Sequence, residues 1–132
     1  MTALLASQGR RSPVHRYRDM DLSSRIDGAS PHALVATLYE ELITALDVLT
    51  RAIERGDSKL RLGQHERATT ILHALDAGLD RVGGGELARS LNTIYRQMQR
   101  RLIAARAGDM AATKEVREGV ANLAMAWNAI AR

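Results

Sequence analysis

Glycine interrupts the chain after Ser30 at three places, and the intervals between these breaks have the length of helices. The breaks are Gly56-Asp57, the run Gly83-Gly84-Gly85, and Gly108-Asp109. Glycine adopts the left-handed conformation that commonly ends a helix at little steric cost. Connections this short between long helices make consecutive helices antiparallel. The sequence therefore predicts an all-α fold, an antiparallel up-and-down four-helix bundle.

Each of the four segments also carries a helical spacing of apolar residues. Ser30 is a favourable N-cap and Pro31 suits the first helical position, so the first helix is predicted from Pro31 to about Arg55. Three further helices are expected over 58–82, 86–107 and from 110 onward. Their apolar residues recur at the i, i+3, i+4, i+7 spacing of a core-facing stripe. These stripes include Leu38, Leu42, Leu46, Leu49, Ala68, Ile71, Leu72, Leu75, Leu79, Val82, Leu87, Leu91, Ile94, Tyr95, Met98, Leu102, Val116, Val120, Leu123, Trp127 and Ile130.

Length and composition predict a single soluble domain with an aliphatic core. The chain has 132 residues, of which 45% are apolar and 26% charged, with no Phe and one Trp. Residues 30–132 are expected to form the bundle, and residues 1–29 a flexible N-terminal tail with few apolar anchors. No segment has the length of a signal peptide's apolar stretch or of a membrane span. The absence of cysteine is compatible with the reducing cytoplasm.

No combination of residues in the sequence predicts catalysis, a metal site or a cofactor. None of the four histidines follows a Glu by three residues, as an inward-facing di-iron site in a bundle requires. His65-Glu66 begins like a zinc-protease helix, but Thr69 stands where the second His should be. Asp76 and Asp80 are expected on one exposed face of the second helix, without an acid–base role. We therefore expect no enzyme, no metal and no cofactor, with His65 and His73 at the surface or its boundary.

Two surface features remain as candidates for binding. The first is a mild basic excess, 19 basic against 15 acidic residues, concentrated in one helix and the tail: Arg96, Arg100, Arg101, Arg10, Arg11, Arg16 and Arg18. Aromatic residues that could stack on bases are scarce, so we expect no nucleic acid as a partner. The second is a set of apolar residues away from the main stripes, which could receive an added amphipathic helix. These residues are Ile43, Val48, Leu62, Ile103 and Met125.

Several motifs, in this order along the chain, resemble one protein family. Ser30-Pro31 is followed by Leu38-Tyr39-Glu40, then by the segment Gly-Gly-Glu-Leu-Ala-Arg-Ser-Leu-Asn-Thr-Ile-Tyr at 84–95, Arg101-Leu102 and Ala126-Trp127. Together they resemble the flagellin-specific export chaperones, the FliS family. The resemblance covers residues 30–132. It implies a cytoplasmic, non-enzymatic chaperone that binds the C-terminal helical region of flagellin, blocks premature filament assembly and delivers the subunit to the type III export apparatus.

The resemblance also suggests where a client would bind. In the family a tyrosine of the N-terminal tail covers a groove in the free protein. Tyr17 is the matching residue here. It lies farther from Pro31 than the corresponding tyrosine does in the family pattern. Positions on the last three helices are the expected groove contacts, although each is equally a core candidate. They are Ile71, Leu75, Leu91, Ile94, Tyr95, Met98, Leu102, Val120 and Leu123.

Two alternative functions stay open on the sequence alone. One is a helical, nucleic-acid-associated regulator that uses the Arg-rich tail and the basic face of the third helix, with binding that weakens steeply as salt rises. The other is a structural bundle that forms homodimers through its exposed aliphatic residues.

Overall fold

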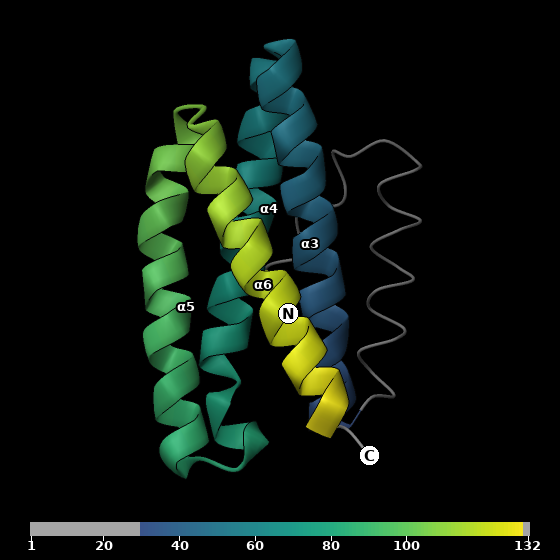
Figure 1. Ribbon diagram of the computed structural model, residues 1–132, viewed down its shortest axis with the longest axis vertical. Helices are drawn as coiled ribbons and strands as arrows, with labels where there is room; N and C mark the ends of the chain where they lie inside the picture. The colour runs from purple at the N-terminus through teal and green to yellow at the C-terminus, as the bar shows by residue number, and fades with distance from the viewer. Residues whose placement is uncertain (1–29, 131–132) are drawn as a thin grey trace.

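The computed structural model describes residues 30–130, with the exception of the side chain of Arg81, and this part of the chain is an all-α four-helix bundle (Figure 1). Its long helices are α3 (Pro31–Arg55), α4 (Ser58–Ala77), α5 (Gly85–Arg106) and α6 (Met110–Ile130). A 3-10 helix, η2 (Leu79–Val82), lies between α4 and α5. Each long helix packs mainly against two others, in the cyclic order α3, α4, α5, α6. The predicted fold class is confirmed.

The helix ends follow the predicted local chemistry. The Ser30 hydroxyl accepts a hydrogen bond from the Ala33 backbone N–H (3.1 Å), and Gly56 ends α3 with a φ of 67°. The Asp57 carboxylate accepts from the N–H of Leu60 at 3.0 Å and so caps α4. Asp109 does the same for Ala112 at the start of α6, also at 3.0 Å. These caps satisfy backbone donors that have no partner within the helix.

The second helix is shorter than the sequence predicted. We expected it to run to Val82, but the α-helix ends at Ala77 and the chain continues as η2. Gly78 follows Ala77 directly, and glycine has the lowest helix propensity of any residue except proline. Leu79 and Val82 were expected to pack against the core from a continuous helix. They do pack against it, but from the tighter turn of η2. Gly83, with a φ of 108°, then ends this turn.

The core is aliphatic and is shared by all four long helices. Leu42, Leu46 and Leu49 of α3 are fully buried and form its centre. Buried residues of the other three helices surround them: Ala68, Ile71, Leu72, Leu75, Leu91, Tyr95, Met98, Leu102, Ala105, Ala112, Val116, Val120 and Trp127. One ion pair lies in this buried region, between Arg67 of α4 and Glu41 of α3 (3.2 Å). None of the helices within residues 30–130 combines the length and the apolar character of a membrane span.

Candidate protein-binding surface

Two tyrosine hydroxyls meet in the middle of the bundle. The hydroxyl oxygens of Tyr39 on α3 and Tyr95 on α5 lie 2.7 Å apart and share a buried hydrogen bond. Burial raises the pKa of both side chains above the ordinary value of 10.0, because the phenolate form would lose its hydration. The pair is therefore neutral at physiological pH. It contributes a fixed contact between two helices that are not direct neighbours in the bundle.

A second polar contact fastens the end of α6 to the start of α3. The indole N–H of Trp127 donates to the backbone carbonyl of His32 at 2.9 Å, and the His32 Nε2 lies 3.3 Å from the carbonyl oxygen of Trp127. The two rings stack with their centroids 4.3 Å apart. Tyr39 meets the same indole edge-on at 6.3 Å. We call the contact between His32 and Trp127 the latch. It holds the last turns of α6 against α3.

At its other end, α6 is held against α5. The guanidinium Nε of Arg101 donates to the Glu115 carboxylate at 2.5 Å. Nearby, Gly119 lets the Met98 side chain reach the α6 backbone, because a Cβ at this position would lie 2.9 Å from Met98 Cε. Figure 1 shows the two helices close together at this end, next to the turn that joins them, while the far end of α6 crosses toward the start of α3. The two helices therefore splay apart along their length.

The nine groove residues predicted from the sequence fall into two groups in the structure. Seven belong to the buried core: Ile71, Leu75, Leu91, Tyr95, Met98, Leu102 and Val120. Ile94 of α5 and Leu123 of α6 are only partly buried and pack against the core from its edge. Of the nine, these two offer the most surface to a partner. Tyr17, the predicted cap of the groove, lies outside the described residues.

Large apolar side chains are exposed at five positions of the described chain. Leu62, Ile103 and Met125 are exposed as predicted from their places off the stripes. Ile43 and Val48 are instead partly buried, and Ile43 packs against the core. Leu87 and Ile130 were expected in the core, because they lie on the apolar stripes of their helices. They are 42% and 61% exposed, since no other helix within residues 30–130 covers the ends of α5 and α6 where they splay.

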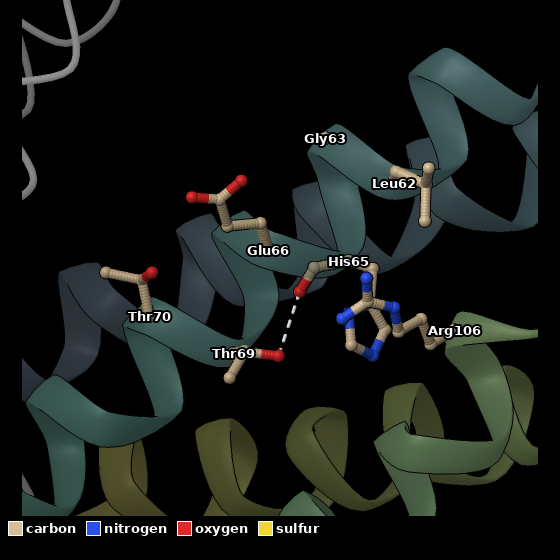
Figure 2. Close-up of a pocket in the computed structure, with 7 residues that line it drawn as sticks. All are labelled: Leu62, Gly63, His65, Glu66, Thr69, Thr70 and Arg106. Carbon is tan, nitrogen blue, oxygen red and sulfur yellow. Dashed lines mark hydrogen bonds between the residues drawn. The ribbon is translucent and has the colours of Figure 1, made fainter.

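A hollow of about 320 Å³ lies over α4 beside the end of α5 (Figure 2). Its lining residues are Leu62, Gly63, His65, Glu66, Thr69, Thr70 and Arg106. The His65 ring is held by the carbonyl of Leu102, 2.6 Å from its Nε2, and the Thr69 hydroxyl donates to the backbone of its own helix. Neither side chain is placed to activate the other. We find no nucleophile and base in hydrogen-bond reach in this hollow.

Some of the remaining candidates for chemistry make structural contacts, and others, among them Asp80 as predicted, are exposed. Asp76 was expected on an exposed face, but it is half-buried and accepts a hydrogen bond from the Asn92 side chain at 2.7 Å. His65 is half-buried and His73 is exposed, as predicted. Across residues 30–130, no group of three acidic, His or Cys side chains could hold a metal ion. In the predicted basic cluster, Arg101 is paired with Glu115, whereas Arg96 and Arg100 are exposed.

The structure thus defines a class of protein: a four-helix bundle that carries exposed aliphatic side chains at the splayed ends of two helices. Comparison with known proteins makes this assignment specific. The family model described as "Flagellar protein FliS" matches residues 13–132, so the chain belongs to the FliS family. The resemblance inferred from the sequence motifs is therefore confirmed.

Three curated relatives carry related names. The flagellar secretion chaperone FliS of Salmonella typhimurium is 34% identical over 121 residues, covering 90% of both chains. The protein of the same name from Vibrio cholerae is 25% identical over 121 residues, covering 91% of this chain and 89% of the relative. The flagellar secretion chaperone FliSB of Pseudomonas aeruginosa is 26% identical over 118 residues, or 89% of this chain and 94% of the relative.

Proposed function

We propose that this protein is a cytosolic export chaperone that binds the C-terminal helical region of flagellin. In this role it keeps the subunit from polymerising prematurely and assists its type III flagellar export. The observation that carries the proposal is membership of a family whose relatives are named flagellar secretion chaperones. Exposed aliphatic side chains on a preformed bundle support it, because such a surface can receive the apolar face of an unassembled client helix.

The proposed client contacts are the nine residues inferred from the sequence, with different roles. Ile94 and Leu123 retain exposed area and would contact the client directly. The seven buried residues would form the support beneath these contacts and fix the shape of the surface. That Tyr17 covers the client-binding groove in the free protein remains a prediction. Transfer of the client to the export gate and formation of a homodimer are predictions as well.

Calorimetric titration tests the proposed function. The purified protein is titrated with a peptide that covers the C-terminal helical region of the flagellin made by the same organism, at low and high salt. We expect one-to-one binding with a negative heat-capacity change and little salt dependence, because apolar surface is buried. Absence of binding by a folded sample would overturn the proposal. Binding of a DNA or RNA oligonucleotide that weakens steeply with salt would instead favour the nucleic-acid alternative.

A further inference from the structure

Positive charge in the described chain is concentrated on one helix, α5. Residues 30–130 together carry 13 basic and 12 acidic residues, so this range is close to neutral. The α5 helix alone carries five arginines and a single acidic residue, Glu86. The positive charge is therefore a local property of one face of the molecule and does not come from the net charge of the bundle.

Three of these arginines form a row along the outer face of α5. Arg89, Arg96 and Arg100 lie within about 40° of one another around the helix axis. Thr93 lies beside them, and Ile103 follows one turn beyond Arg100. All five side chains are exposed. We call this row of five residues the α5 ridge.

The α5 ridge points away from the other helices. Asn92 bonds to Asp76 of α4 on one side of α5, and Arg101 pairs with Glu115 of α6 on the other side. The ridge lies between these two contacts on the face opposite the core, and Figure 1 shows α5 at the edge of the bundle. Ile94, the proposed client contact on this helix, lies about 160° around the axis from Arg96. The ridge is therefore a separate surface.

Local helix chemistry does not account for Arg96 and Arg100. No acidic residue lies three or four positions before or after either of them. The two are themselves four residues apart, a spacing at which like charges repel each other. Both precede the last turn of α5, where the helix dipole would favour a positive charge. Neither has an ion-pair partner among residues 30–130.

A second arginine pair in the bundle has the same spacing in ordinary surroundings. Arg51 and Arg55 of α3 are exposed and four residues apart. Asp47 and Glu54 lie four residues before and three residues after Arg51, so acidic side chains are at helical spacing from it. Arg55 lies in the last turn of α3. Local features therefore explain the pair on α3, whereas the pair on α5 has no such compensation.

The surroundings of the ridge favour an acidic protein segment over a nucleic acid. All tyrosine and tryptophan side chains of residues 30–130 are buried, so none of these rings is free to stack on a base. The neighbouring helices carry exposed carboxylates, Glu66 on α4 and Glu118 on α6, which would repel a phosphate chain lying across them. Ile103 is 73% exposed, and arginine beside an aliphatic side chain suits a protein interface.

We propose that the α5 ridge is a docking site for an acidic helix of a partner protein, with Arg96, Arg100 and Ile103 as its contacts. The two arginines are about 6 Å apart along the helix axis, which is the separation of positions i and i+4 on any helix. Two carboxylates of the partner at this spacing pair with them, and an aliphatic residue one turn further covers Ile103. This partner is distinct from the client, so the inference does not depend on the proposed function.

The test uses an alanine-rich peptide of about 20 residues, long enough to form a helix, that carries Glu at i and i+4 and Leu at i+7. A second peptide has the same composition in scrambled order. Each peptide is titrated into the full-length protein at low and high salt. The ridge variant is Arg96→Gln with Arg100→Gln. The control variant, Arg51→Gln with Arg55→Gln, removes the same charge from the exposed pair on α3. Circular dichroism checks that both variants remain helical.

We expect the control variant to bind the helical peptide within about threefold of wild type, and the ridge variant to bind it at least about tenfold more weakly. Wild-type binding should weaken as salt rises, because it depends on exposed charges. The scrambled peptide should bind at least about tenfold more weakly than the helical one, because its carboxylates are out of register. Absence of wild-type binding, equal loss in both variants or equal binding of both peptides would overturn the docking site.

A single variant tests the apolar part of the ridge. Ile103→Ser should weaken binding of the helical peptide by about three- to tenfold, because less apolar surface is buried. The salt dependence should stay as in wild type, since both arginines remain. Unchanged affinity in this variant would contradict the contact with Ile103.

Two further titrations separate the ridge from other sites. A single-stranded RNA oligonucleotide that binds more tightly than the helical peptide, and that the ridge variant no longer binds, would overturn the protein partner in favour of a nucleic acid. The flagellin C-terminal peptide should bind the ridge variant as tightly as wild type. Loss of that binding would overturn the ridge as a separate site. Failure of the wild-type protein to bind the flagellin peptide would overturn the proposed function alone.

Discussion

At the scale of single residues, the polar side chains of the bundle act chiefly as connectors between helices. The tyrosine pair joins α3 to α5, and Asn92 joins α5 to α4 through Asp76. Arg117 of α6 donates to Asp47 of α3 at 3.0 Å. Each connector is satisfied by a partner from another helix, and removing one partner of a buried pair leaves the other in an unfavourable environment.

The buried tyrosine pair allows a prediction about stability. Tyr39→Phe removes one hydroxyl and leaves the hydroxyl of Tyr95 buried without its partner. We expect the free energy of unfolding to fall by about 1–3 kcal/mol, and the double change to Phe at both positions to cost less than the sum of the single changes. Urea unfolding of the four proteins measures this coupling. Additive losses would show that the hydroxyls do not depend on each other.

The same pair predicts how stability changes at high pH. Folding raises both tyrosine pKa values above 10.0, so the unfolded chain loses these protons first as the pH rises. The contribution of the tyrosine pair to the free energy of unfolding is complete below about pH 10. It declines above this pH, by up to about 1.4 kcal/mol per pH unit for each tyrosine. Urea unfolding between pH 8 and pH 11 checks this. The double Phe variant serves as the control and should show a shallower decline.

At the scale of elements, the relation between α5 and α6 depends on close contact at one end and a latch at the other. Gly119 brings the two helices together, and the stacked rings of His32 and Trp127 hold the end of α6 to α3. Neither contact is visible in the apolar periodicity of α6, which is continuous from Val116 to Ile130. The crossing of α6 over the bundle is therefore decided by a few specific contacts.

Two glycine substitutions separate helix propensity from packing. Gly63→Ala should raise the free energy of unfolding by about 0.5–1 kcal/mol, because a Cβ in the middle of α4 meets no atom within 4 Å. Gly119→Leu should lower it by about 1–3 kcal/mol, because the larger side chain must displace Met98 or push α5 away. Chemical unfolding gives both values. A stabilising Gly119→Leu change would show that α5 and α6 tolerate separation at this contact.

The latch gives a second prediction for α6. His32→Ala removes the stacked ring and should lower the free energy of unfolding by about 1 kcal/mol. Backbone amides over 124–130 should exchange faster with solvent, because the last turns lose the stacked ring and keep only the Trp127 bond to the backbone carbonyl at position 32 and the Tyr39 contact. Hydrogen exchange measured by mass spectrometry resolves this segment. His73→Ala, at an exposed histidine of α4, is the matched control and should leave exchange in α6 unchanged.

At the scale of the whole molecule, residues 30–130 form a packed bundle that leaves Leu87 and Ile130 exposed at the splayed ends of α5 and α6. Its core residues come from all four long helices, so the fold does not depend on a client for its centre. The exposed side chains of Leu87 and Ile130 leave part of the possible burial to a partner. This arrangement suits a protein that is folded before it meets its client.

Binding of the client should therefore raise the stability of the whole bundle. A flagellin C-terminal peptide at about 100 times its dissociation constant should stabilise the folded protein by about 2.7 kcal/mol, because it binds the folded state alone. Thermal unfolding followed by circular dichroism, with and without peptide, measures the shift. The Leu87→Ser, Ile130→Ser variant at the same peptide concentration should show a smaller shift. An equal shift in both proteins would show that Leu87 and Ile130 do not contact the peptide.

The sequence by itself determined the number of helices, their caps and most of the core. These features are local: Ser30, Asp57 and Asp109 cap their helices through neighbouring backbone groups, and the stripes follow from helical spacing. One local signal was missed, since Gly78 ends α4 before η2. Gly78 could have been detected, because an isolated glycine near a helix end is a recognised stop signal.

Only the tertiary structure decided which residues of a stripe are covered. Leu87 and Leu91 share the apolar stripe of α5, yet Leu91 is 4% exposed and Leu87, one turn nearer the end of α5 from which α6 splays away, is 42% exposed. Periodicity fixes the direction of a side chain around its helix axis, but it carries no information on how far away the next helix lies. That distance depends on Gly119 and on the latch, which join segments remote in sequence. The candidate binding surface follows from this spacing.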